Sequence, residues 1–310
     1  MAQDPIPLQK VTFESTLKSS DTEEKLDILF YRPIGYRIAL FCAAVKITPN
    51  TVTIISIFFG VAAGILFYYP ELWINVIGML LLVFANSLDS ADGQLARMTN
   101  NKSRIGRILD GLAGDFWFFS IHVAICLRSQ NEGWSAWIWV WGVIAGASHV
   151  LQSALGDYYR NVHLFFIKGT DGSELDNSAH LQKEYDQLSW SKNFVKKFMS
   201  RSYLNYTKLQ ENLSPNLQKL LRAVHRKFPN GKMPDALVAD FRQQNKPLMR
   251  FTNIIQFNTR VIFLFVWLFM NQSWLYFMFD MFVLNAFLIY MNRRQESISK
   301  TFYKRISTEA

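Results

Sequence analysis

Apolar runs of near-spanning length recur six times along this chain of 310 residues. A bilayer core of about 30 Å needs about 20 mostly apolar helical residues to cross it. The third and fifth runs reach that length if their helices begin before the apolar stretch. The six runs cover residues 51–69, 72–88, 116–127, 134–155, 260–270 and 274–291, and the third helix is expected to begin near residue 105. The pattern therefore predicts an all-α, multi-pass integral membrane protein with six transmembrane helices.

Ahead of the first run, residues 31–46 mix apolar side chains with Tyr and basic residues, as in a helix that lies in the headgroup layer. The first span is predicted to begin at Thr48, an N-cap residue, followed by Pro49 at the first helical position. The pattern divides the chain into five segments. These are a polar N-terminal segment (1–30), the interfacial helix with spans one to four (31–165), a basic insert (166–250), spans five and six (251–292) and a basic tail (293–310).

The insert between the fourth and fifth spans carries most of the net charge. Residues 168–250 contain 15 basic and 8 acidic side chains, a net of +7 out of +9 for the whole chain. Its middle has helical periodicity, broken at Pro215, and Trp190, Phe194 and Phe198 fall four apart on one face. Two interpretations stay open: a solvated helical hairpin, or a lid over the active site that anionic lipid attracts. Because no nucleic-acid recognition motif accompanies the charge, no nucleic acid is expected as a partner.

Basic residues also predict the orientation. The loop at 97–107, the insert and the tail are rich in Lys and Arg, whereas the three opposite loops hold one basic residue among them. By the positive-inside rule, both termini and the active site are expected on the cytoplasmic side. The aromatic load of 26 Phe, 12 Tyr and 9 Trp is heavy for a soluble domain and fits a membrane protein. Cys42 and Cys126 have no metal-ligand spacing and are interpreted as packing residues.

Carboxylates gather where the second run ends and the third helix begins. Asp89 and Asp92 are three apart, so a helix presents both on one side. On the next helix Asp110 is flanked at intervals of four by Gly106 and Gly114. If the two helices pack along these stripes, three carboxylates face one cleft.

Such a group of like charges raises the pKa values of its members unless cations enter it. Oxygen ligands favour Mg²⁺, Mn²⁺ or Ca²⁺, and the absence of Cys and His from this stretch disfavours zinc. Gly93 would let a polyanionic ligand approach the backbone, and Arg97 is one turn away for a phosphate oxygen. The stretch therefore predicts a divalent-metal and phosphate site.

The same residues resemble the signature of the CDP-alcohol phosphotransferase family, D-x2-D-G-x2-A-R-x8-G-x3-D-x3-D. The matching positions are Asp89, Asp92, Gly93, Ala96, Arg97, Gly106 and Asp110. The resemblance implies that the hydroxyl of an alcohol attacks a CDP-linked substrate, one of the two being a lipid, and that CMP is released. It also implies two Mg²⁺ or Mn²⁺ ions on the carboxylates, a nucleotide site lined by Gly93, Ala96 and Arg97 together with Asp89, and a homodimer.

One position departs from the signature. Its last Asp, which in the family is a metal ligand and the expected base, would fall at Gly114, and Asp115 follows. A local bulge that turns Asp115 toward Asp110 would make Asp115 the fourth metal ligand and, with Asp110, a catalytic residue. Other proton acceptors stay open, as does a loss of catalysis: Asp157 or His149 on the fourth helix, His122 on the third, water, and product phosphate.

Two directions of transfer also stay open: CDP-diacylglycerol with a polar alcohol, or a CDP-linked headgroup with diacylglycerol or ceramide. The rival interpretations are a catalytically silent member that binds metal and nucleotide, and a transporter with a carboxylate ion site. Two further charges lie in the last spans. Asp280 is expected in a dimer contact or a polar bond between helices, and Arg260 is expected as an interfacial anchor or a headgroup ligand.

Overall fold

The computed structural model describes residues 12–16, 19–229 and 231–308, and these are helical with no strand among them. Six of its helical segments are long and apolar enough to cross a membrane. They are Pro49–Leu66, Leu72–Met98, Arg104–Asn131, Ile138–Lys168, Asp235–Phe269 and Leu275–Thr308. The predicted all-helical fold with six spans is confirmed, and it indicates a multi-pass membrane protein.

The chain forms two compact units, and the boundary between them falls within long helices. Unit 1 takes in the residues up to Ala147 together with Val261–Phe279, and unit 2 takes in Ser148–Arg260 together with the residues from Asp280 onward. This division differs in kind from the five sequence segments, which stay a prediction.

Unit 1 contains α1 (Arg32–Ala44), α2 (Pro49–Leu66), α3 (Leu72–Met98) and α4 (Arg104–Asn131), with α2 packed on both α3 and α4. Glycines make this packing close. A Cβ placed on Gly60 would lie 2.2 Å from the ring of Trp117, and one on Gly64 would lie 2.0 Å from Oγ of Ser120. Small residues at such contacts are the usual means by which membrane helices approach one another.

Arg128, near the end of α4, joins several parts of unit 1. Its guanidinium is buried and donates to the Phe67 carbonyl at 3.3 Å, to Oδ1 of Asn271 at 2.5 Å and to Glu132 at 3.0 Å. A buried cation is stable only when its donors are satisfied in this way. The end of the helix bundle formed by the chain reversals at Phe67 and Asn271 is therefore tied together by one side chain.

Unit 2 contains the insert, which is helical as predicted. Its helices are α6 (Ser178–Asp186), α7 (Phe194–Asn212), α8 (Pro215–Lys227), α9 (Asp235–Asn245) and α10 (Met249–Ile254). The amphipathic helix α8 buries Leu217, Leu220 and Val224 and packs against α13 (Asn285–Thr308). Glu296 of α13 accepts the backbone N–H groups of Asn216 and Leu217 at 2.8 and 3.0 Å, which satisfies the free donors at the start of α8.

A buried polar network lies where α5 (Ile138–Lys168), α11 (Phe257–Phe269) and a π-helical turn, Phe279–Leu284, meet. Arg260 donates to Asp280, to Gln152 and to the Ile255 carbonyl, and Gln152 donates to the Asp280 carbonyl at 3.0 Å. Asp280 therefore forms a polar bond between helices, one of its two expected roles. The prediction that Arg260 is an interfacial anchor is wrong, because its side chain is buried and its charge is taken up by Asp280.

Candidate metal and nucleotide site

Three carboxylates of unit 1 converge. One oxygen each from Asp89, Asp92 and Asp110 lies within 4.8 Å of the others. Asp92 is buried, Asp89 is half-buried and Asp110 is exposed, so the group reaches from the packed interior to an open side. The two predicted stripes on α3 and α4 do meet.

The turn between α3 and α4 brings the carboxylates together. Asn100 adopts a left-handed conformation (φ 50°), and the N–H of Asn101 returns to the Ala96 carbonyl at 3.0 Å, which ends α3. Ser103 then caps α4, accepting the N–H of Gly106 on its hydroxyl at 3.0 Å. The eight residues between Arg97 and Gly106 are therefore the end of one helix, a reversal and the cap of the next.

The two motif glycines have different surroundings. A Cβ on Gly106 would lie 2.9 Å from Oδ1 of Asn50 and 3.0 Å from Oγ of Ser103, so glycine permits the close approach of α2 to the start of α4. A Cβ on Gly93 would lie at an ordinary contact distance, 3.5 Å from Nη1 of Arg97. The Arg97 guanidinium thus folds back over Gly93, one turn earlier on α3, and Gly93 has no steric need to be glycine within the chain itself.

The first span contributes a residue that the sequence analysis missed. Thr48 caps α2 as predicted, accepting the N–H of Thr51 at 3.3 Å. One turn later, the buried hydroxyl of Thr53 lies 2.5 Å from Oδ2 of Asp92 and 3.1 Å from the Pro49 carbonyl. Thr53 therefore orients the most buried carboxylate of the three. The sequence offered little sign of this role, because Thr53 lies one turn into α2, a helix without Asp or Glu.

Asp115 is not a member of the group of three carboxylates. Helix α4 is regular over Arg104–Asn131, without the bulge that would turn Asp115 toward Asp110. Five residues along a regular helix amount to a rotation of about 140°. At Gly114 an added Cβ would meet no atom within 4 Å, so the position where the family carries its last Asp is open space.

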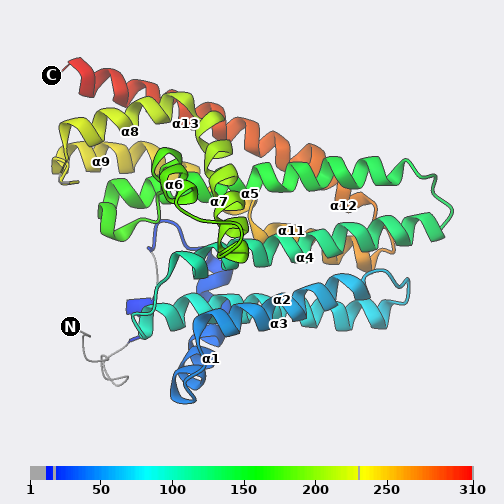
Figure 1. Cartoon of the computed structure of the whole chain (residues 1–310). Coiled ribbons are helices and arrows are strands. Elements are labelled where there is room, and N and C mark those ends of the chain that lie inside the picture. The colour runs from blue at the N-terminus through cyan, green and yellow to red at the C-terminus, as the bar shows by residue number, and fades with distance from the viewer. Residues whose placement is uncertain (1–11, 17–18, 230, 309–310) are drawn as a thin grey trace. The chain divides into compact units, whose positions relative to one another are not determined.

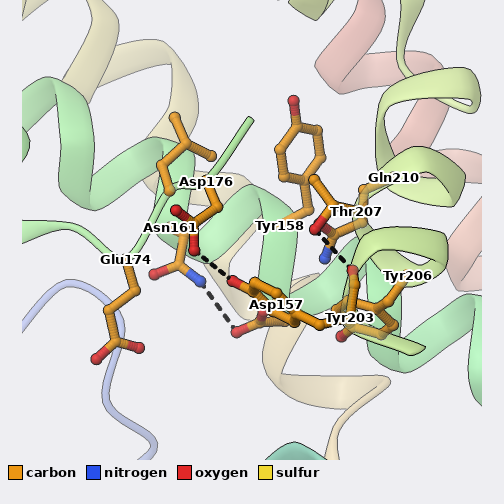
Figure 2. Close-up of a pocket in the computed structure, with 10 residues that line it drawn as sticks. Asp157, Tyr158, Asn161, Glu174, Asp176, Tyr203, Tyr206, Thr207 and Gln210 are labelled. Atoms are coloured by element: carbon orange, nitrogen blue, oxygen red, sulfur yellow. Dashed lines mark hydrogen bonds between the residues drawn. The ribbon is translucent and has the colours of Figure 1, made fainter. Parts of the chain in front are cut away.

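The other candidate proton acceptors lie in different settings. In unit 1, Nδ1 of His122 lies 2.6 Å from the Phe118 carbonyl, and its ring stacks on Phe277 with centroids 5.5 Å apart. In unit 2, His149 is buried, and Asp157 accepts a hydrogen bond from the Asn161 amide at 3.1 Å (Figure 2). His122 is therefore held in an aromatic stack, and Asp157 forms part of a polar layer between helices.

The three carboxylates fit a divalent cation. They offer hard oxygen donors within a space that one or two ions span, and the group contains no thiolate or imidazole. Within the described ranges, no other cluster of three or more Asp, Glu, His or Cys residues has this geometry. Such a group at the ends of two candidate spans has the donor set of a divalent-cation site, as found in metal-assisted enzymes and in ion-binding membrane proteins.

Comparison with known proteins narrows this class. Residues 46–161 match the model of the CDP-alcohol phosphatidyltransferase family, whose members transfer substituted phosphate groups. The resemblance to this family that the motif predicted is confirmed over this part of the chain. A bifunctional IPC transferase and DIPP synthase of Aquifex aeolicus is 25% identical over 108 residues, or 35% of this chain. The match spans 24% of that relative's length.

Proposed function

We propose that the chain transfers a phosphate-linked group from a CDP-activated substrate to an alcohol hydroxyl, making a polar lipid and releasing CMP. The observation that carries the proposal is the convergence of Asp89, Asp92 and Asp110 inside the segment that matches the family. The Aquifex relative is named as a transferase and synthase, which is in keeping with group transfer.

In this proposal Asp89, Asp92 and Asp110 hold two divalent ions, Mg²⁺ or Mn²⁺. When bound, such ions screen the pyrophosphate charge and stabilise the leaving group. Thr53 orients Asp92, because its hydroxyl is already within hydrogen-bond distance of that carboxylate. Asp89 also borders the nucleotide site, with Gly93 and Ala96 supplying a surface without bulk.

Arg97 would donate to a phosphate oxygen. Its guanidinium lies beside Gly93, so a phosphate resting on the bare backbone there would meet the cation at once. The lipid is either the CDP-linked donor, as CDP-diacylglycerol, or the acceptor, as diacylglycerol or ceramide. The family also supports a homodimer, and the distribution of basic residues supports a cytoplasmic active site.

Asp115 stays the proposed proton acceptor and fourth metal ligand, a role that requires a local turn in α4, because the regular helix points Asp115 away from the other three carboxylates. It is the next carboxylate after Asp110 along α4, and its side chain is exposed. The regular helix argues for a weaker role than that of a family Asp at position 114. Asp115→Asn tests whether Asp115 is the base. Loss of a positioned base lowers the rate by about 10²–10⁴-fold, whereas a weaker role gives a smaller loss.

The assay uses the full chain reconstituted in lipid with Mg²⁺ or Mn²⁺ and a panel of CDP-linked donors and alcohols, with CMP as the readout. Metal-dependent CMP release that requires one donor and one acceptor supports the proposal. Metal-dependent binding of the nucleotide with no CMP release from any pair would overturn it in favour of a catalytically silent member, an alternative that the glycine in place of the last signature Asp supports. Absence of both binding and release would remove the nucleotide site as well.

A further inference from the structure

The start of α7 and the turn before it, in the insert, expose four large apolar side chains. Trp190 is 41% exposed, Phe194 64%, Val195 67% and Phe198 54%. We call these four residues the aromatic patch. Phe194 and Phe198 are one turn apart on the helix, and the rings of Trp190 and Phe194 lie 5.7 Å apart, so the patch is contiguous. Contiguous exposed apolar surface marks an interaction site more often than chance exposure does.

The patch is not the packing face of its helix. Further along α7, Leu204, Thr207 and Gln210 are buried within unit 2. The outer side that continues from the patch becomes polar, with Asn205 and Lys208 exposed. The C-terminal half of α7 therefore packs against the rest of unit 2. The aromatic patch at its N-terminal end is covered by nothing in the described part of unit 2.

Positive charge surrounds the patch. Between Gln187 and Arg201 the chain has four basic residues, Lys192, Lys196, Lys197 and Arg201, and no acidic residue. Nζ of Lys197 donates to the Leu188 carbonyl at 2.6 Å and lies 5.5 Å from the centre of the Trp190 ring. Lys197 thus holds the preceding turn against the helix, so the rings and charges form one preorganised surface.

The contacts of α7 with α5 indicate at which level along the candidate span α5 the helix lies. Helix α7 crosses the candidate span α5 at a steep angle (Figure 1). Gln210 donates to the Ala154 carbonyl of α5 at 2.9 Å, and Ser214, just after α7, lies 2.9 Å from the Tyr159 hydroxyl. This is where the apolar part of α5 gives way to polar residues such as Asp157.

A water-sized polar cavity of about 10 Å³ lies at the same level, lined by α5, the 174–176 segment and α7 (Figure 2). Tyr203 of α7 donates to Asp176 there at 2.8 Å. Polar cavities of this size are typical places for a bound water. The contact between α7 and α5 is therefore polar, as expected at the edge of the hydrocarbon layer.

We propose that the aromatic patch inserts into the boundary between headgroups and acyl chains, and that the lysines around it bind anionic headgroups. The occupant of this surface is a negatively charged lipid bilayer surface. Aromatic rings favour this zone, and nearby Lys and Arg are attracted to anionic lipid. The insert would then be anchored to the membrane about three to four helical turns along α7 from its contact with α5 at Gln210.

The test places a fluorophore on a thiol introduced at Phe194→Cys in the full chain, reconstituted in bilayers whose acyl chains carry a bromine quencher. Both native thiols are buried, so the introduced thiol is expected to take the label. Wild-type protein treated with the same reagent should stay unlabelled, which checks this. Asn205→Cys is the matched control, since it is exposed on the same side of the same helix, about three turns away. We expect strong quenching at position 194 and little at 205. Equal quenching at the two positions, or none at 194, overturns the proposal.

The second arm tests the lipid charge. Quenching at position 194 is measured in anionic bilayers and in zwitterionic ones, with Lys192→Gln and Lys196→Gln added singly and together. We expect each removed charge to lower the ratio of inserted to free patch by about five-fold in anionic lipid, and to have little effect in zwitterionic lipid. Quenching that is the same in both lipids overturns the assignment of an anionic surface. This readout does not depend on CMP release, so it stands or falls apart from the proposed function.

Discussion

Carboxylates on the candidate membrane spans are balanced in two different ways in this protein. In unit 2, Asp280 is fully buried and accepts a hydrogen bond from Arg260, whose other donors go to Gln152 and a backbone carbonyl. In unit 1, Asp89, Asp92 and Asp110 face one another within 4.8 Å and reach from the interior to an exposed edge.

The difference lies in where the balancing charge comes from. A carboxylate in a region of low dielectric constant is costly unless a cation accompanies it. For Asp280 the chain itself supplies that cation, and the result is a closed link between helices. The group of three concentrates negative charge on an open side, which is the arrangement that an external divalent ion completes. The Arg260–Asp280 pair links helices, and the group of three carboxylates leaves space for an external cation.

Breaking the internal pair is expected to have the largest effect. Arg260→Met leaves Asp280 without its guanidinium, so the free energy of unfolding should fall by about 3–5 kcal/mol. Denaturant unfolding of the reconstituted full chain measures this. The control is Arg260→Met combined with Asp280→Leu, which removes both charges and should recover most of the loss. A single variant as stable as the wild type would mean that the pair contributes nothing.

Removing one member of the group of three should cost activity and not stability. Asp110→Asn is expected to lower metal-dependent CMP release by at least roughly 100-fold, since even residues that only support metal ligands are worth about 10–100-fold. The metal-free protein should be as stable as the wild type or more so, because one of three like charges is gone.

The same variant sharpens the comparison without any assay of activity. At a Mg²⁺ concentration about 100 times its dissociation constant, the wild-type protein should gain about 2.7 kcal/mol of stability, and Asp110→Asn should lose most of that gain. Removal of the metal with a chelator should return the wild type to its metal-free stability. If Mg²⁺ stabilises both proteins equally, the carboxylates are not its ligands.

A smaller effect is expected from the residue that orients Asp92. Thr53→Val keeps the shape of the side chain and removes the hydroxyl, so CMP release should fall by about 10-fold with a parallel loss of metal affinity. Thr53→Ser keeps the hydroxyl and should restore both. A loss of rate with unchanged metal affinity, or a failure of Ser to rescue, would show that Thr53 does not act through Asp92.

The smallest effect is expected at the open position on α4. Gly114→Asp adds a carboxylate one turn after Asp110, where a Cβ meets no atom within 4 Å. Metal affinity should rise by up to about five-fold, as for an added exposed charge. Gly111→Asp is the matched control, because that position is equally open and lies on another side of the helix. Equal effects at both positions would indicate general electrostatics and not ligation.

Much of the fold and part of the site could be predicted from local pattern. Hydrophobic length predicted the six spans, and helical spacing together with the family motif predicted that Asp89, Asp92 and Asp110 would face one cleft. The predicted interfacial role of Arg260 failed because the sequence does not reveal which helix a charge will meet. Asp280 is 20 residues away, and only the packing of the π-helical turn against α11 brings the two together.

What the sequence alone determined are the properties of single helices: their length, their apolar character, their caps such as Thr48, and the stripe on which a side chain lies. What only the tertiary structure decided are the relations between helices. These include the contact of Thr53 with Asp92, 39 residues apart, and the open space at Gly114. The physical reason is that hydrogen bonding and burial within a helix depend on near neighbours, whereas the partner of a side chain depends on how whole helices are rotated and pressed together.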